Sequence, residues 1–175
     1  MTVVVLTAAD VPRYRELMLE AYAQSPDAFT STPEERAAEP PSWWVRRVVD
    51  PAGLTVAFGA FREQELVGTV ALEFSAKPKT RHKAHLIGTY VKPIARGTGA
   101  GRALVDAALD HLSGRPAVST VVLTVTQGNE PAIRLYRAAG FMEFGVEPMA
   151  ILTPGGYRAK VHMWREVHGA TGTAA

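Results

Sequence analysis

The 175-residue chain contains no cysteine and no apolar run long enough to span a bilayer, and neither sign of charge is in large excess. The lack of cysteine excludes disulfides and a cysteine nucleophile, and it fits a cytoplasmic protein. Without an apolar run of about 18 residues, the sequence predicts no membrane span. Lysine and arginine number 19 against 17 aspartates and glutamates, so composition gives no indication of a nucleic-acid partner.

Internal repeats and long linkers are also missing, so we expect a single domain over residues 1–168. Apolar periodicity predicts the order strand, two helices, three strands, helix, strand, helix, two strands. The expected strands are 2–6, 54–62, 65–75, 83–91, 118–126, 141–152 and 157–166, and the expected helices are 11–24, 42–49, 99–111 and 130–139. Residues 25–41 hold four of the twelve prolines and predict an irregular loop. We expect residues 169–175 to form a flexible C-terminal tail.

The most informative segment begins where the apolar run 86–91 ends, at Pro93. Gly97, Gly99 and Gly101 follow at alternate positions, and an amphipathic helical pattern starts at once. Alternate glycines let the backbone turn tightly and bring successive N–H groups against one ligand. At a helix N-terminus such groups favour an anion. The segment therefore predicts a strand, an anion-binding turn and a helix, with a pyrophosphate as the expected anion.

The spacing excludes two common phosphate motifs. A Walker loop needs a Lys-Ser/Thr pair after the glycines, and none follows. A dinucleotide fingerprint, G-x-G-x-x-G, would place its third glycine at Arg102 or Leu104. The remaining pattern resembles the coenzyme A signature of the GCN5-related N-acetyltransferase (GNAT) family, Q/R-x-x-G-x-G/A. Arg96, Gly99 and Gly101 occupy its three fixed positions.

A second motif strengthens this resemblance, because the glycines alone could form a merely structural turn. The β-branched strand 118–126 is followed by Asn129, which can cap a helix, and by a helix that a later glycine can end. The same family carries a strand, an Asn and then A-x-x-L-Y-x-x-x-G-F. The matching residues are Ala132, Leu135, Tyr136, Gly140 and Phe141. The resemblance covers residues 55–165, with a fainter match through the first 50.

The resemblance implies an α/β (α+β) GNAT fold, with a mixed, mostly antiparallel, twisted sheet of about seven strands and helices on both faces. In that family the fourth and fifth strands splay apart, and acetyl-CoA, the co-substrate, enters the gap; no metal is implied. Two of the residues expected to bind the cofactor have an alternative role. Arg102 could be a solvated helix residue, and Asn129 could serve only to cap its helix. The residues expected to bind the cofactor are Tyr90, Val91, Arg96, Gly97, Thr98, Gly99, Ala100, Gly101, Arg102, Ala103, Asn129, Ala132 and Tyr136.

Acetyl transfer needs a general acid and a neutral amine. The Tyr136 phenol is the candidate acid, because a phenol held close to the leaving thiolate can protonate it. His85 is a candidate base, since it precedes Val91 by six residues and period two would place both on one side of the strand. Some relatives carry a Glu base near this slot. Glu73 and a water relay are the alternatives, and each of these side chains could also have a purely structural or surface role.

We therefore expect an N-acetyltransferase that moves an acetyl group from acetyl-CoA to a primary amine by direct attack in a ternary complex. The alternatives are a non-catalytic acyl-CoA-binding regulatory module and a protein (lysine or N-terminal) acetyltransferase. The expected partner is a small-molecule or peptide amine, and the chain is expected to be a monomer or homodimer. Phe29, Trp43, Trp44 and Tyr157 are candidates to line the acceptor end, with at least one tryptophan in the core.

Overall fold

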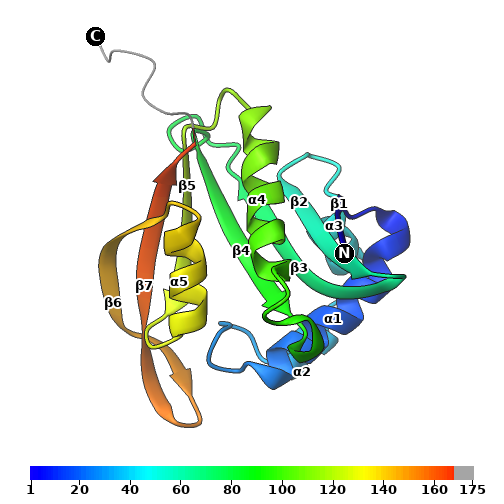
Figure 1. Cartoon of the computed structure of the whole chain (residues 1–175), viewed down its shortest axis with the longest axis horizontal. Helices are drawn as coiled ribbons and strands as arrows, with labels where there is room; N and C mark the ends of the chain where they lie inside the picture. The colour runs from blue at the N-terminus through cyan, green and yellow to red at the C-terminus, as the bar shows by residue number, and fades with distance from the viewer. Residues whose placement is uncertain (168–175) are drawn as a thin grey trace.

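The computed structural model describes residues 1–167, so the tail predicted at 169–175 lies outside the described residues. One seven-stranded sheet with the order β1-β2-β3-β4-β5-β7-β6 forms the centre of the molecule (Figure 1). The strands are β1 (Thr2–Val5), β2 (Thr55–Arg62), β3 (Glu65–Phe74), β4 (Lys83–Val91), β5 (Thr120–Thr126), β6 (Met142–Thr153) and β7 (Gly156–Glu166). Neighbouring strands are antiparallel except for β4 and β5. The predicted mixed, mostly antiparallel sheet is thus confirmed.

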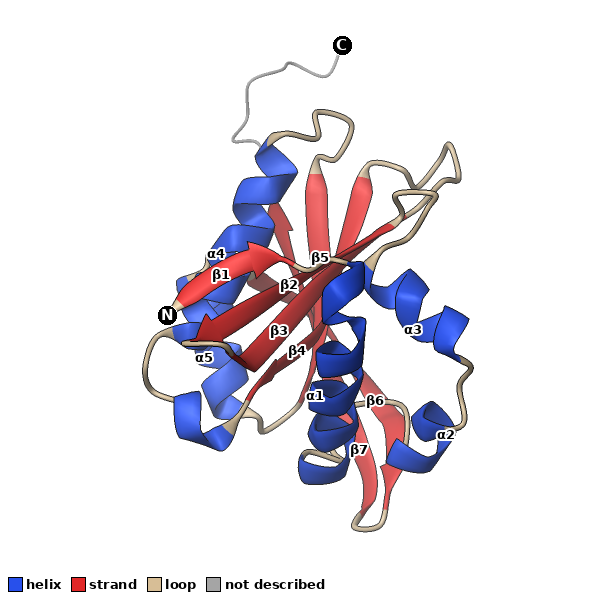
Figure 2. Cartoon of the chain, turned by 90° about the vertical axis from the view of Figure 1, so that its right-hand side faces the viewer, coloured by secondary structure: helices blue, strands red, loops and turns tan. Residues whose placement is uncertain are grey.

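Helices cover both faces of this sheet. They are α1 (Val11–Gln24), α2 (Pro33–Ala37), α3 (Pro41–Val48), α4 (Ala100–Ser113) and α5 (Glu130–Ala138), with short 3-10 turns at Ala8–Asp10 and Pro93–Ala95. The first three helices lie on one face and α4 and α5 on the other (Figure 2). Each face encloses an apolar cluster, one built around Leu104 and Val105 of α4 and the other around Tyr14 and Trp44. Within residues 1–167 no helix is long and apolar enough to cross a membrane.

The loop predicted over residues 25–41 contains the short helix α2, so that prediction was wrong in part. The Thr32 side chain accepts a hydrogen bond from the Glu35 amide, and the Glu35 carboxylate accepts one from the Thr32 amide at 2.8 Å. This reciprocal pair is a capping box, and Pro33 occupies the first helical position, where its missing N–H is not needed. The prolines of this segment therefore start helices as well as interrupting them.

Strands β4 and β5 separate soon after they begin. They pair over three residues only, the last pair being His85 with Val122. Beyond this point β3 continues to pair with β4 and β7 with β5, while β4 and β5 diverge (Figure 1). The backbone of residues 86–91 consequently lacks a neighbouring strand on one edge. This divergence confirms the splay that the GNAT resemblance implied.

A β-bulge interrupts β4 in its second half. The register passes from Ala71 opposite Ile87 to Thr69 opposite Tyr90, so two β4 residues face one residue of β3. Gly88, the first of the two, has a φ of +62°. A glycine accepts this conformation without the penalty that a Cβ would bring. The extra residue changes which face of the sheet each later side chain meets.

This change of face corrects one prediction about the site. Val91 packs against the apolar cluster that contains Leu86, whereas Ile87 and Tyr90 belong to the cluster on the opposite face. His85 alternates with Leu86 and therefore does not share a side with Val91. The prediction that these two residues point the same way was wrong, because period-two alternation does not continue across a bulge.

Candidate active site

Two cavities open where β4 leaves β5. The first, the glycine cavity, has a volume of about 500 Å³ and is lined by the end of β4, the glycine turn and the start of α5. The second, the central cavity, has a volume of about 510 Å³ and is lined by β4, β5, α5 and β7. The two cavities adjoin, and the residues that line both are Ala28, Phe29, Thr89, Asn129, Ala132 and Leu135. Molecules bound in the two cavities would therefore meet at this junction.

Free backbone amides face the glycine cavity. Gly97 and Gly99 have φ values of +75° and +88°, and a Cβ added at either would meet no atom within 4 Å. Glycine is thus required there by the backbone conformation rather than by crowding. Ala103 is the first residue of α4 whose amide is hydrogen-bonded, to the Gly99 carbonyl at 3.0 Å. The preceding amides of residues 100–102 have no acceptor within residues 1–167, and such amides at a helix N-terminus bind anions.

Two arginines line this cavity, and they differ in how their charge is used. The Arg102 side chain donates to both carboxylate oxygens of Asp106 at 2.8 Å and to the Ala138 carbonyl at 3.0 Å. Its charge is therefore largely compensated. Arg96 donates to the Val91 carbonyl at 3.0 Å and forms no ion pair with the residues that the structure describes. Of the two, Arg96 has the guanidinium charge available to an anionic ligand.

Most of the residues predicted to bind the cofactor line the glycine cavity, but three do not. The Thr98 hydroxyl donates to the Ala95 carbonyl at 2.7 Å. The Ala103 amide is already bonded within the helix, and Tyr136 lines the central cavity instead. Asn129 lines both cavities, and its side-chain oxygen also caps α5 by accepting from the Ala132 amide at 3.3 Å. The two roles considered for Asn129 are therefore compatible.

Tyr136 lies in the wall of the central cavity, on α5. Its side chain is 6% exposed and packs edge-to-face on Phe141. Burial raises the pKa of the Tyr136 phenol, and the nearby Thr89 hydroxyl opposes that rise. The Thr89 Oγ1 is itself buried and forms no hydrogen bond within residues 1–167. A phenol with a raised pKa keeps its proton at neutral pH, so the Tyr136 hydroxyl is protonated there.

A family model described as the acetyltransferase (GNAT) family matches residues 14–141. The chain belongs to this family. Curated relatives include the mycothiol acetyltransferase of Thermomonospora curvata, 35% identical over 130 residues, which are 74% of this chain and 39% of the relative. The Thermobispora bispora mycothiol acetyltransferase is 33% identical over 144 residues, or 80% of this chain and 45% of the relative. The chain thus spans less than half the length of these relatives.

Solved GNAT structures share the fold. A phosphinothricin acetyltransferase from Sinorhizobium meliloti in complex with AcCoA superposes with a TM-score of 0.84 at 21% identity, over 99% of this chain and 91% of that one. The yncA protein of Salmonella typhimurium, a putative acetyltransferase with its cofactor acetyl-CoA, gives a TM-score of 0.80 at 19% identity, over 100% and 98% of the two chains. At these identities the likeness establishes the fold alone.

Four basic side chains from β4 and β7 line the central cavity, and one of them is Lys83 of β4. His85 comes from β4 and forms no side-chain hydrogen bond within residues 1–167, whereas Lys160 and His162 come from β7. The His162 Nε2 lies 3.0 Å from a carboxylate oxygen of Glu147 on β6. Lys160 and His162 are lining residues that were not predicted from the sequence. Their spacing by two along one strand, which places them on the same face, is the signal that was available.

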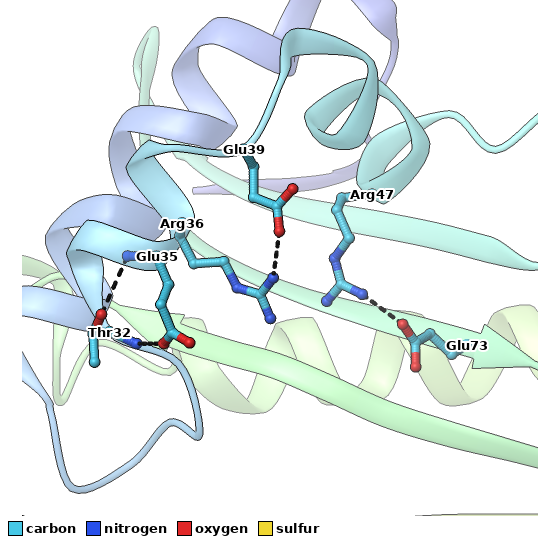
Figure 3. A network of polar contacts seen from close by, with 6 residues as sticks. All are labelled: Thr32, Glu35, Arg36, Glu39, Arg47 and Glu73. Atoms are coloured by element: carbon cyan, nitrogen blue, oxygen red, sulfur yellow. Dashed lines mark hydrogen bonds and ion pairs between the residues drawn. The ribbon is translucent and has the colours of Figure 1, made fainter.

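Glu73 lies outside both cavities. Its carboxylate accepts a hydrogen bond from Arg47 of α3 (Figure 3), and the Arg47 guanidinium also lies over the Trp43 ring, 5.4 Å from its centroid. Arg36 and Glu39 form a second ion pair nearby, at 3.3 Å. The Arg47–Glu73 pair connects α3 to β3. Glu73 therefore occupies a position suited to holding α3 rather than to accepting a proton from a bound amine.

Three of the four aromatic residues expected at the acceptor end line neither cavity. Phe29 lines both cavities. Trp44 is 1% exposed and packs edge-to-face on Tyr14, which confirms that at least one tryptophan belongs to the core. Trp43 is covered by arginine side chains, and Tyr157 is 56% exposed. Of the four, only Phe29 is placed to contact a ligand in either cavity.

Proposed function

We propose that the chain is an acetyl-CoA-dependent N-acetyltransferase that transfers an acetyl group to a primary amine by direct attack in a ternary complex. The observation that carries this proposal is the junction of the two cavities. The glycine cavity offers free amides to an anion, and the central cavity contains the protonated Tyr136. Thr89 and Asn129 line both. Family membership supports acetyl-CoA as the ligand of the glycine cavity and an amine as the ligand of the central cavity.

The residues of the glycine cavity fit coenzyme A. The amides of residues 100–102 would bind its pyrophosphate, with Arg96 adding charge. The backbone of residues 86–91 lacks a strand on one edge. Peptide groups there could bond the pantetheine amides, as a sheet edge bonds an added strand. Open space beside Gly97 and Gly99 lets a ligand approach the backbone closely.

Bound acetyl-CoA supplies the acetyl group as an activated thioester. Tyr136, which lines the central cavity, would give its phenolic proton to the sulfur that leaves as the C–S bond breaks and the C–N bond forms. Because burial raises the pKa of this phenol, proximity to the thiolate must compensate for its weak acidity. The absence of cysteine from the sequence removes one covalent route and favours direct attack.

We infer that His85, rather than Glu73, accepts the proton of the amine. His85 lines the central cavity, and within residues 1–167 its ring has no hydrogen bond that would compete. Glu73 lines neither cavity, and its carboxylate is engaged by Arg47. A water relay to His85 would serve the same purpose if the two groups are not in direct contact.

Two variants separate these roles. We expect His85→Ala to lower kcat by about tenfold or more, because a general base is lost. Glu73→Gln should leave turnover unchanged and lower the free energy of unfolding by about 1 kcal/mol, as expected for a partly exposed ion pair. Steady-state kinetics and urea unfolding of both variants provide the measurements. A loss of turnover in Glu73→Gln at unchanged stability would transfer the role of base to Glu73.

Calorimetric titration with acetyl-CoA, CoA, ATP and NADH in parallel tests the function directly. We expect binding of the two CoA species only, because the turn fits neither nucleotide motif. Preference for ATP or NADH would overturn the proposal. Thiol release with a panel of amines then separates the alternatives. Binding without turnover on any amine would indicate a regulatory acyl-CoA-binding module, and turnover on peptides alone would indicate a protein acetyltransferase.

A further inference from the structure

The central cavity is basic. The chargeable side chains that line it are Lys83, His85, Lys160 and His162, and no aspartate or glutamate is among its lining residues. A site that selects an acceptor by its ammonium charge would be expected to present carboxylates to it. This lining instead favours an acceptor that brings negative charge of its own. Such an acceptor would carry an anionic group in addition to the amine.

Lys160 is a buried lysine without an acidic partner among the residues that the structure describes. Its side chain is 8% exposed, and within residues 1–167 it forms no ion pair and no hydrogen bond. By contrast Lys92, which is more exposed, pairs with Glu65 at 2.8 Å and with Glu20 at 3.7 Å. Withdrawing most of a lysine side chain from water without a counter-charge disfavours its charged form. Burial lowers the pKa of Lys160 accordingly, with Glu147 opposing that shift.

Glu147 does not form an ion pair with Lys160. Its carboxylate pairs with the His162 ring at 3.0 Å and lies beyond ion-pair distance of the Lys160 ammonium. Glu147 also does not line the central cavity, whereas Lys160 and His162 do. The nearest acidic group is therefore already engaged. An anion entering the central cavity would supply the missing counter-charge to Lys160.

We propose that the acceptor is a small amine that also carries a carboxylate, in the simplest case an amino acid, and that Lys160 binds the carboxylate. This inference rests on the proposed acetyltransferase function. Tyr136 and Lys160 line the same cavity, so one small molecule can present its amine towards the former and its carboxylate to the latter. A volume of about 510 Å³ suits a ligand of that size. Lys160 is then a binding and specificity residue, not a proton donor.

Matched pairs of acceptors test the proposal. Each free amino acid is compared with its carboxamide, which keeps the amine and the size and removes the charge. For wild-type protein we expect kcat/KM to be at least about tenfold higher for the acid, the effect of one charge-assisted contact. Lys160→Met, which keeps the apolar stem, should abolish that preference by raising KM for the acid. Lys160→Arg should retain most of it.

Two controls make the result specific. Lys79→Met removes the same charge from an exposed turn and should leave the acid-to-amide ratio unchanged. Acetyl-CoA binding by Lys160→Met, measured by calorimetry, should equal that of wild type, which also shows that the variant is folded. Equal use of acids and amides by wild type, or a preference that survives in Lys160→Met, would overturn the inference. Failure to bind acetyl-CoA at all would instead overturn the proposed function.

Discussion

Tyr136→Phe is expected to lower kcat by about a hundredfold or more, while acetyl-CoA affinity stays within a few-fold of wild type. The variant removes one hydroxyl and keeps the ring that packs on Phe141, so the fold should be preserved. Acetyl-CoA affinity should persist because Tyr136 lines the central cavity and not the glycine cavity. Single-turnover kinetics with saturating acetyl-CoA and a fixed amine measure the chemical step.

Tyr157→Phe is the matched control for this experiment. Tyr157 is 56% exposed and lines neither cavity, so the same chemical change there should leave kcat at the wild-type value. The pH profile gives a second readout. Since burial raises the pKa of Tyr136 above its usual value of about 10, the acid remains protonated up to that pH, and the loss of activity caused by its deprotonation should appear only above it. Unchanged kcat in Tyr136→Phe would remove this residue from the acid role.

Gly99→Val should raise the dissociation constant for acetyl-CoA by about tenfold or more, since one well-placed charge-assisted contact is worth over 1 kcal/mol. Gly99 precedes α4 with a φ of +88°, a conformation that β-branched residues avoid. The turn would have to reorient, and the amides of residues 100–102 would no longer converge on one anion. Calorimetry with acetyl-CoA provides the measurement.

Gly53→Val controls for backbone strain. Gly53 has a φ of +68°, and a Cβ there also meets no atom within 4 Å, but it lies in the turn before β2, outside both cavities. Both variants should lose about 1–2 kcal/mol of stability from the left-handed conformation. Only Gly99→Val should weaken acetyl-CoA binding. Equal losses of affinity in the two variants would mean that strain, and not the arrangement of the amides, governs binding.

The glycine turn and the two helices beside the cavities could be predicted because their signals are local. Gly97 and Gly99 need positive φ, and Asn129 caps the helix that carries Tyr136, so a few neighbouring residues determine each structure. The capping box that begins at Thr32 was an equally local signal, and the prolines around it obscured it. The positions of these features follow from short-range geometry alone.

Features that depend on distant residues could not be predicted in the same way. Glu73 meets Arg47, which precedes it by 26 residues, through the packing of α3 on the sheet. Lys160 and His162 reach the central cavity only because β7 pairs with β5. The bulge at Gly88 had one weak signal, an isolated glycine inside a strand pattern. Pairing and packing across the sheet therefore decide which charged groups share a cavity.

The extra residue of β4 makes the site sensitive to the number of residues in this strand. If one residue at position 88 or 89 were deleted, the ladder with β3 could close without interruption. Every side chain from Tyr90 onward would then exchange faces, so Val91 would leave the α4 side and Tyr90 would enter it. A substitution in β4 changes one side chain, whereas a single insertion or deletion would change which side chains form both walls of the site.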